Sequence, residues 1–403
     1  MIYNIKEHHG VKLLRTNTFF NVPLVLAIFA STLLSFASTV YAQEQAQPTD
    51  QKNRENPSGV VRIRNLFGND VVNSSNQQKN KTDEIRKKKR AGLLIDLREE
   101  MRRFVQSISE FARGHNPNFV IIVKDGLELL VKRDIVDETR ISPARTYMRS
   151  IDGILAEGLF DSDGAPNKPI LSDRQRNLLS RADNAHKNGI RVFTLDIGEG
   201  RAVIDNVFAQ ASNHGYISLV SNQPFSEIAS LPTYPKRPFN ENPNSIITLD
   251  QVKNFFVVSN SQSFGREDQF TLTLHGNNYD MVVVDVFHNR MPLSRRAVET
   301  LKYKKIGTKR LVLAMMDLGA GASYAYYWKS NWQEGYPEWI DAPVRGDPDR
   351  YNVKFWHPGW QQIINGNSNS YVYGLIAQGF DGVVISGVEA FKFFEAGGQE
   401  EAD

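Results

Sequence analysis

Eight short runs of consecutive apolar residues constrain the fold of this 403-residue chain more than any other feature. Continuous apolar runs, unlike alternating ones, are typical of strands buried on both faces, as in a parallel sheet covered by helices. Stretches of helical period separate most of them, and residues 101–111 are the clearest example. The eight runs are residues 119–123, 151–156, 192–197, 216–220, 255–258, 281–286, 311–316 and 383–385.

Eight runs favour a single (β/α)8 barrel, because that fold has eight strands and the length of the chain is sufficient for it. An open, doubly wound sheet is the alternative. However, no G-x-G-x-x-G motif follows a run, and the sequence contains no P-loop. We therefore predict a closed α/β barrel over residues 91–395, followed by a flexible tail at 396–403.

The N-terminus has the layout of a secretory signal peptide. Basic residues precede an apolar run at 19–37, and residues 40–42 offer small side chains for cleavage. An uncleaved anchor is the alternative, because the run approaches the ~20 residues that span a bilayer; its serines and threonines favour cleavage. We predict a signal peptide over 1–42 and a periplasmic or secreted protein without stable membrane insertion.

The composition predicts a linker after the N-terminal segment and excludes several classes of protein. Residues 43–90 are polar, with little to bury, and end in the basic run 86–90, so we predict a disordered linker. Lysine and arginine total 48 against 45 acidic residues, which is too even for a general nucleic-acid binder. The absence of cysteine excludes disulfides and thiolate zinc sites.

Charged residues follow most of the predicted strands, where barrel enzymes carry their chemistry. Converging carboxylates are typical of glycosidases, which use one as acid and one as base or nucleophile. For any single residue, capping of the next helix is the alternative. No histidine-rich ligand motif occurs, so no metal or cofactor is predicted. The catalytic candidates are Glu157, Asp196 and Asp285, and the strand-end candidates for substrate binding are Lys124, Asp125, Asp317 and Glu389.

All five tryptophans fall within residues 328–360, and several tyrosines and prolines join them in a window that begins at Tyr324. We interpret this window as a long, ordered, aromatic-rich loop over the C-terminal mouth of the barrel. Aromatic rings stack on the apolar faces of sugars, which makes Tyr324, Trp328 and Trp356 candidates for substrate binding. The alternative is that these rings form a small core of the loop itself.

Together these stretches resemble glycoside-hydrolase family 114, the endo-α-1,4-polygalactosaminidase-like barrels, over residues 98–395. In that family the part similar to 255–391 comes first and the part similar to 101–232 follows, so the chain resembles a circular permutation of it. The resemblance implies that the helix beginning near Leu97 lies beside the strand at 383–385. Its carrying stretches are 101–105, 119–126, 151–160, 279–285, 318–328, 353–356, 360–361 and 379–382.

The chain departs from the family at several functional positions. Where the family typically has Gly-Glu-Ala-Glu, or a close variant with glutamine first, followed by arginine, this sequence has Gly319-Ala320-Gly321-Ala322 and then Ala325. Ser386 and Glu389 stand where the family has two aspartates, and Lys124-Asp125-Gly126 replaces Gln-Asn-Gly. A methyl group cannot transfer a proton, so the resemblance implies a lost or weakened hydrolase. The matching positions are Asp285, Glu157, Asp196, Tyr324, Trp328 and Trp356.

The first hypothesis is therefore an exported, glycosidase-like barrel that binds or processes a galactosamine-type polysaccharide, with its ancestral activity lost or weakened. The first alternative is an active endo-acting glycosidase that uses Glu157, Asp196 and Asp285. The second alternative is a non-catalytic interaction scaffold of the cell envelope. The sequence leaves open whether the chain is an enzyme. The expected partner is a carbohydrate polymer rather than a nucleic acid.

Overall fold

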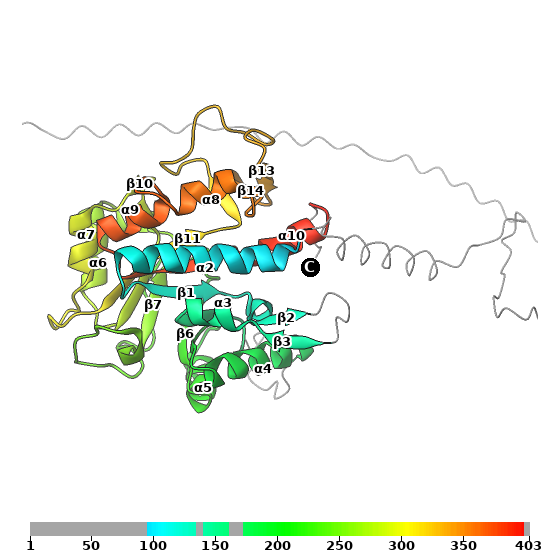
Figure 1. Cartoon of the computed structure of the whole chain (residues 1–403). Coiled ribbons are helices and arrows are strands. Elements are labelled where there is room, and N and C mark those ends of the chain that lie inside the picture. The colour runs from blue at the N-terminus through cyan, green and yellow to red at the C-terminus, as the bar shows by residue number, and fades with distance from the viewer. Residues whose placement is uncertain (1–94, 134–139, 161–171, 399–403) are drawn as a thin grey trace, which may run out of the picture. The chain divides into compact units, whose positions relative to one another are not determined.

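The computed structural model describes residues 95–133, 140–160 and 172–398 of the chain (Figure 1). The predicted signal peptide and linker lie outside these ranges, as does most of the predicted C-terminal tail. Within the described ranges, no helix has the length and apolar character needed to cross a membrane.

The eight predicted runs all form strands, and these strands make one parallel sheet. Their spatial order is β6-β5-β4-β1-β15-β11-β8-β7. Apart from β6 and β7 at the two edges, each strand pairs with its neighbours in chain order, and the last strand pairs with the first. The α/β barrel prediction is confirmed at this level. The strands are β1 (Val120–Lys124), β4 (Gly153–Glu157), β5 (Arg191–Ile197), β6 (Ile217–Ser221), β7 (Phe255–Val258), β8 (Met281–Val284), β11 (Leu311–Asp317) and β15 (Gly382–Ser386).

The sheet is a nearly closed barrel. β15 pairs with β1 in parallel register from Val120 opposite Gly382 to Val123 opposite Ile385. A side chain at Gly382 would collide with the carbonyl oxygen of Val120, so glycine permits this close approach. β6 and β7 contact each other at the remaining seam, but no ladder joins them in the described sheet. The barrel is therefore sealed between its first and last strands and left open between β6 and β7.

Helices cover the outside of this sheet (Figure 1). Asp96 caps the N-terminus of α2, where its side chain accepts a hydrogen bond from the backbone N–H of Glu99, and the helix buries Met101, Phe104 and Ile108. The α-helices are α2 (Leu97–His115), α3 (Arg145–Ser150), α4 (Asp173–Lys187), α5 (Arg201–Asn213), α6 (Glu267–His275), α7 (Arg295–Leu301), α8 (Pro358–Ile364), α9 (Tyr371–Gln378) and α10 (Phe391–Glu395). The 3-10 helices are η1 (Leu127–Leu130), η2 (Leu249–Gln251), η3 (Gln262–Phe264) and η4 (Val388–Ala390).

Short antiparallel strands are inserted after several barrel strands. β2 (Val131–Arg133) pairs with β3 (Ile141–Pro143), and β9 (Phe287–His288) pairs with β10 (Met291–Pro292). After β11, the strands β12 (Ala320–Ala322), β13 (Ile340–Val344) and β14 (Asp347–Val353) form a three-stranded sheet in the order β12-β14-β13. Its register places Arg350 opposite Ala322. This insertion therefore brings β14 next to the C-terminal end of β11.

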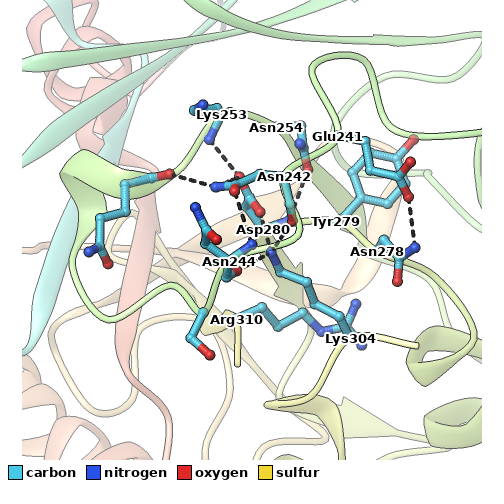
Figure 2. A network of polar contacts seen from close by, with 12 residues as sticks. Glu241, Asn242, Asn244, Lys253, Asn254, Asn278, Tyr279, Asp280, Lys304 and Arg310 are labelled. Atoms are coloured by element: carbon cyan, nitrogen blue, oxygen red, sulfur yellow. Dashed lines mark hydrogen bonds and ion pairs between the residues drawn. The ribbon is translucent and has the colours of Figure 1, made fainter. Parts of the chain in front are cut away.

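A buried polar network lies at the N-terminal ends of β7, β8 and β11 (Figure 2). Asp280 precedes β8, and its carboxylate accepts hydrogen bonds from the ammonium of Lys304 at 2.6 Å and from the backbone of Lys253 at 2.8 Å. Lys304 also donates to the backbone carbonyls of Asn242 and Asn244. This network fastens the segment between β6 and β7, which contains no α-helix, to the rest of the barrel.

Candidate functional site

A cavity of about 450 Å³ opens at the C-terminal ends of the strands. The ends of β1, β4, β7, β8, β11 and β15 all reach it, because parallel strands of a barrel end on the same side. It brings together five of the residues that the sequence predicts for the site, namely Lys124, Glu157, Asp285, Asp317 and Tyr324.

Lys124 is held between two carboxylates. Its ammonium pairs with Asp125 and, at 2.8 Å, with Glu157. Burial lowers the pKa of Lys124, but these two carboxylates outweigh burial and raise it above its ordinary value. Glu157 also accepts a hydrogen bond from the backbone N–H of Phe225 at 2.9 Å. Lys124 therefore stays charged, and Glu157 is fixed between β1 and the segment that follows β6.

Asp317 is likewise engaged. One oxygen accepts hydrogen bonds from the backbone N–H groups of Gly319 and Ala320, at 2.8 and 3.0 Å. The other pairs with the guanidinium of Arg350. Asp317 raises the pKa of Arg350 further, so the arginine remains a cation. Asp317 consequently positions Arg350 in the cavity.

Asp285 is placed differently. It follows β8 and accepts a hydrogen bond from the backbone N–H of Phe287 at 3.0 Å, and among the described residues no ion pair involves it. Burial raises the pKa of Asp285 to about 6, despite the opposing effects of that hydrogen bond and of Arg350. A carboxylate with this pKa exchanges a proton near neutral pH, as a general acid or base requires.

Three of the predicted strand-end residues are not among those that line the cavity, namely Asp125, Asp196 and Glu389, and of these Asp125 pairs with Lys124. The side chain of Asp196 is fully buried and accepts a hydrogen bond from the backbone of Phe160 at 2.6 Å. This burial removes the access that a catalytic carboxylate needs. Glu389 pairs with Lys392 at 2.7 Å, and Lys392 in turn contacts Glu128, so Glu389 belongs to a surface ion-pair network.

The tryptophans pack on one another instead of lining the cavity. Trp328 stacks on Tyr351 with 5.2 Å between ring centroids, and it meets Trp332 edge-on at 5.5 Å. Trp332 and Trp339 continue the cluster to the fully buried Trp360. Separately, Trp356 packs against Phe394 at 4.7 Å. The cluster matches the alternative of a small core, and the cavity is lined by tyrosines.

Among the further residues that line the cavity, Tyr327, Asp347, Arg350 and Tyr371 were not among the predicted site residues. Asp347 and Arg350 belong to β14, which lies about 30 residues after β11 in the sequence and does not follow directly on any barrel strand. Their position depends on the pairing of β14 with β12, for which the sequence carries no signal. Tyr371 is the first residue of α9, and no motif in the sequence marks it.

The charge of the cavity is unbalanced. Four carboxylates, those of Glu157, Asp285, Asp317 and Asp347, face only two cations among the described lining residues, Lys124 and Arg350. Nowhere in the described ranges do three or more histidine, aspartate or glutamate side chains form a cluster able to hold a metal ion. The excess of carboxylates over cations in the lining would attract a cationic ligand.

Comparison with models of known protein families gives no match. Among curated proteins, the chain is similar to three uncharacterized ones. It is 29% identical to one from Methanocaldococcus jannaschii over 126 residues, 31% of this chain and 35% of that protein. For one from Thermotoga maritima the identity is 21% over 151 residues, 38% of this chain and 45% of that protein. For one from Deinococcus radiodurans the identity is 30% over 122 residues, which are 30% of this chain and 36% of that protein. The chain thus spans less than half the length of these relatives.

Proposed function

We propose that the cavity binds an amino-sugar polymer of the galactosamine type. The observation that carries this proposal is the acidic excess of the cavity, in which Asp285 and Asp347 have no ion-pair partner among the described residues. A protonated amino group would be attracted to these carboxylates. The tyrosines Tyr324, Tyr327 and Tyr371 supply aromatic surface beside them, which suits the apolar face of a sugar ring.

We further propose that hydrolysis of this polymer is lost or weakened in the chain. The departures from family 114 at Ala320 and Ala322 remove carboxylates, and both alanines line the cavity. Glu157 and Asp317 are engaged in ion pairs, and Asp196 is buried. An ion pair makes a carboxylate a weaker base, and a fully buried carboxylate such as Asp196 has no access to a substrate. These features together support binding as the main activity.

An active glycosidase remains the second candidate, and one observation favours it. Asp285 has a pKa near 6, which suits the acid that protonates a leaving glycosidic oxygen. The second carboxyl group of such an enzyme would be Asp347, which lines the same cavity. Both carboxylates act on the pKa of Tyr324, which burial raises first and Asp285 and Asp347 raise further, so both lie near this ring.

We also propose that the chain is a circular permutation of the family, because of where the barrel is left unpaired, between β6 and β7. In an unpermuted member, the chain would begin at the strand similar to β7 and end at the one similar to β6. That junction is the one that no ladder closes here, whereas β15 and β1 pair over four residues. A permuted chain also aligns with a relative over only one of its two parts at a time, which accords with matches covering 30–38% of this chain.

Calorimetric titration tests the binding proposal. We expect heat of binding from de-N-acetylated galactosamine oligomers and much less from N-acetylated oligomers of the same length, which lack the charge. Asp285→Asn should weaken binding of the charged oligomer and leave that of the neutral one unchanged. Equal binding of both oligomers, or none of either, would refute the proposal.

A reducing-end assay on the same polymer distinguishes binding from hydrolysis. Release of new reducing ends by the wild type, lost in both Asp285→Asn and Asp347→Asn, would establish the glycosidase. Binding without release would establish the weakened-hydrolase reading. Export is proposed from the sequence alone, and N-terminal sequencing of the protein recovered from cells would show whether residues 1–42 are removed.

A further inference from the structure

A tight turn projects from the end of the barrel opposite the cavity. It comprises residues 303–309, here called the basal turn, between α7 and β11. Tyr303 and Lys309 form an antiparallel bridge, and the backbone N–H of Gly307 donates to the carbonyl of Lys304 at 2.8 Å. Gly307 has a φ of +84°, a conformation that favours glycine. The turn therefore has a defined, hydrogen-bonded shape.

The cations in and beside the basal turn divide into two sets. Lys304 and Arg310 point inward and are 0% and 2% exposed. Arg310 donates to the carbonyls of Leu301 and Leu274, and Lys304 to Asp280 (Figure 2). Burial lowers the pKa of Arg310 to about 9, which still leaves it charged at neutral pH. These inward cations fix the turn to the barrel.

The outward set combines positive charge with apolar surface. Lys305 and Lys309 are exposed, and Ile306 and Tyr303 between and beside them are 49% and 40% exposed. The backbone carbonyl of Lys309 accepts a hydrogen bond from Ile246, and the next residue, Ile247, is 60% exposed. A rigid turn thus presents aliphatic and aromatic side chains flanked by lysines.

We propose that the basal turn docks on an anionic lipid surface. Exposed isoleucine and tyrosine gain free energy by entering the headgroup region, while lysine ammonium groups remain at the level of the phosphates. Glu241, which accepts a hydrogen bond from Asn278 beside the turn, has Arg237 at 3.8 Å, so the acid does not cancel the lysines. A polyanionic sugar would use the lysines but leave Ile306 without a partner. Docking here directs the cavity away from the membrane.

Vesicle co-sedimentation of the full chain tests this proposal. The probes are vesicles of phosphatidylcholine with 30% phosphatidylglycerol, and vesicles of phosphatidylcholine alone. Lys305→Gln/Lys309→Gln should lower the partition coefficient on anionic vesicles by about 5-fold for each lysine and about 25-fold together. The matched control is Arg174→Gln/Lys187→Gln on α4, which removes two exposed cations elsewhere. The apolar residues 19–37 are common to all variants, so differences between variants report the turn.

Ile306→Ser distinguishes a lipid surface from a soluble polyanion. On anionic vesicles we expect Ile306→Ser to bind several-fold more weakly than wild type, with unchanged thermal unfolding. Three results would each overturn the proposal: equal effects of the turn and control variants, equal binding to neutral and anionic vesicles, or a lysine-dependent but Ile306-independent association that a dissolved anionic polysaccharide reproduces.

Discussion

Replacing Lys304 by methionine removes the buried ammonium that joins Asp280 to the segment before β7. All three of its protons are donated, to Asp280 at 2.6 Å and to the carbonyls of Asn242 and Asn244 at 2.7 and 2.8 Å. Both charged side chains are 0% exposed. Methionine has a similar volume, so the change deletes the charge and its hydrogen bonds with little change in packing.

The free energy of unfolding should fall by about 3–5 kcal/mol, the usual cost of breaking a buried ion pair by removing one partner. Most of this cost arises because the carboxylate of Asp280 stays in a water-poor site with its cation gone. The backbone of Lys253 and the amide of Asn242 remain as donors to that carboxylate, at 2.8 and 3.4 Å. Because these two donors still stabilise the carboxylate, we expect the loss of unfolding free energy to stay within this range and not to exceed it.

Urea unfolding followed by tryptophan fluorescence measures the effect. Lys305→Met is the matched control, because the neighbouring lysine is exposed and its loss should change stability by no more than about 0.5 kcal/mol. The double variant Asp280→Asn/Lys304→Met should be more stable than Lys304→Met, since it leaves no unpaired charge. Ligand binding in the cavity should persist, because the pair lies at the other end of the barrel.

A loss below about 1 kcal/mol in Lys304→Met would refute the argument that the buried pair holds this segment. So would a double variant whose loss equals the sum of the two single losses, because additivity means that the two groups do not interact.

Three further predictions concern the cavity. Burial raises the pKa of Asp285 to about 6, so between about pH 4 and 6 the folded state holds a proton that the unfolded state has lost, and the protein loses stability as pH rises through that window. Asp285→Asn should therefore be more stable than wild type at pH 7, by up to about 3 kcal/mol in urea unfolding, and the difference should vanish below about pH 4. Gly387→Ala should lower the melting temperature more than Gly346→Ala. Both glycines have positive φ, at +70° and +78°, but a methyl group at Gly387 would collide with the carboxylate of Asp317 at the end of β11, whereas at Gly346 it would meet nothing within 4 Å. Trp328→Phe should leave the dissociation constant of the amino-sugar oligomer unchanged in titration, whereas Tyr324→Ala should raise it about tenfold or more, because the tyrosine lines the cavity and the tryptophan does not.

Much of the fold could be predicted from the sequence because burial on both faces of a parallel sheet leaves a local signal. Every predicted apolar run is a strand, and α2 buries the face that its periodicity indicated. The meeting of Lys124, Glu157, Asp285 and Asp317 could be predicted for the same reason, since the ends of parallel strands converge on one rim.

Which of these side chains are available was decided by tertiary structure. Asp196 and Asp285 look alike in sequence, since both stand at the end of an apolar run, yet Asp196 is sealed and Asp285 reaches the cavity. The side chain of a strand residue points inward or outward according to the twist and register of its neighbours, which are fixed by pairing between distant segments.

By itself, then, the sequence determined the strands, their parallel character and the end of the barrel where charged groups gather, because each depends on residues close together in the chain. Tertiary structure alone decided that β14 brings Asp347 and Arg350 into the cavity, that Lys124 neutralises Glu157, and that the tryptophans pack on one another. The first two outcomes depend on contacts between residues far apart in the chain, Ala322 with Arg350 and Lys124 with Glu157, which no local pattern encodes.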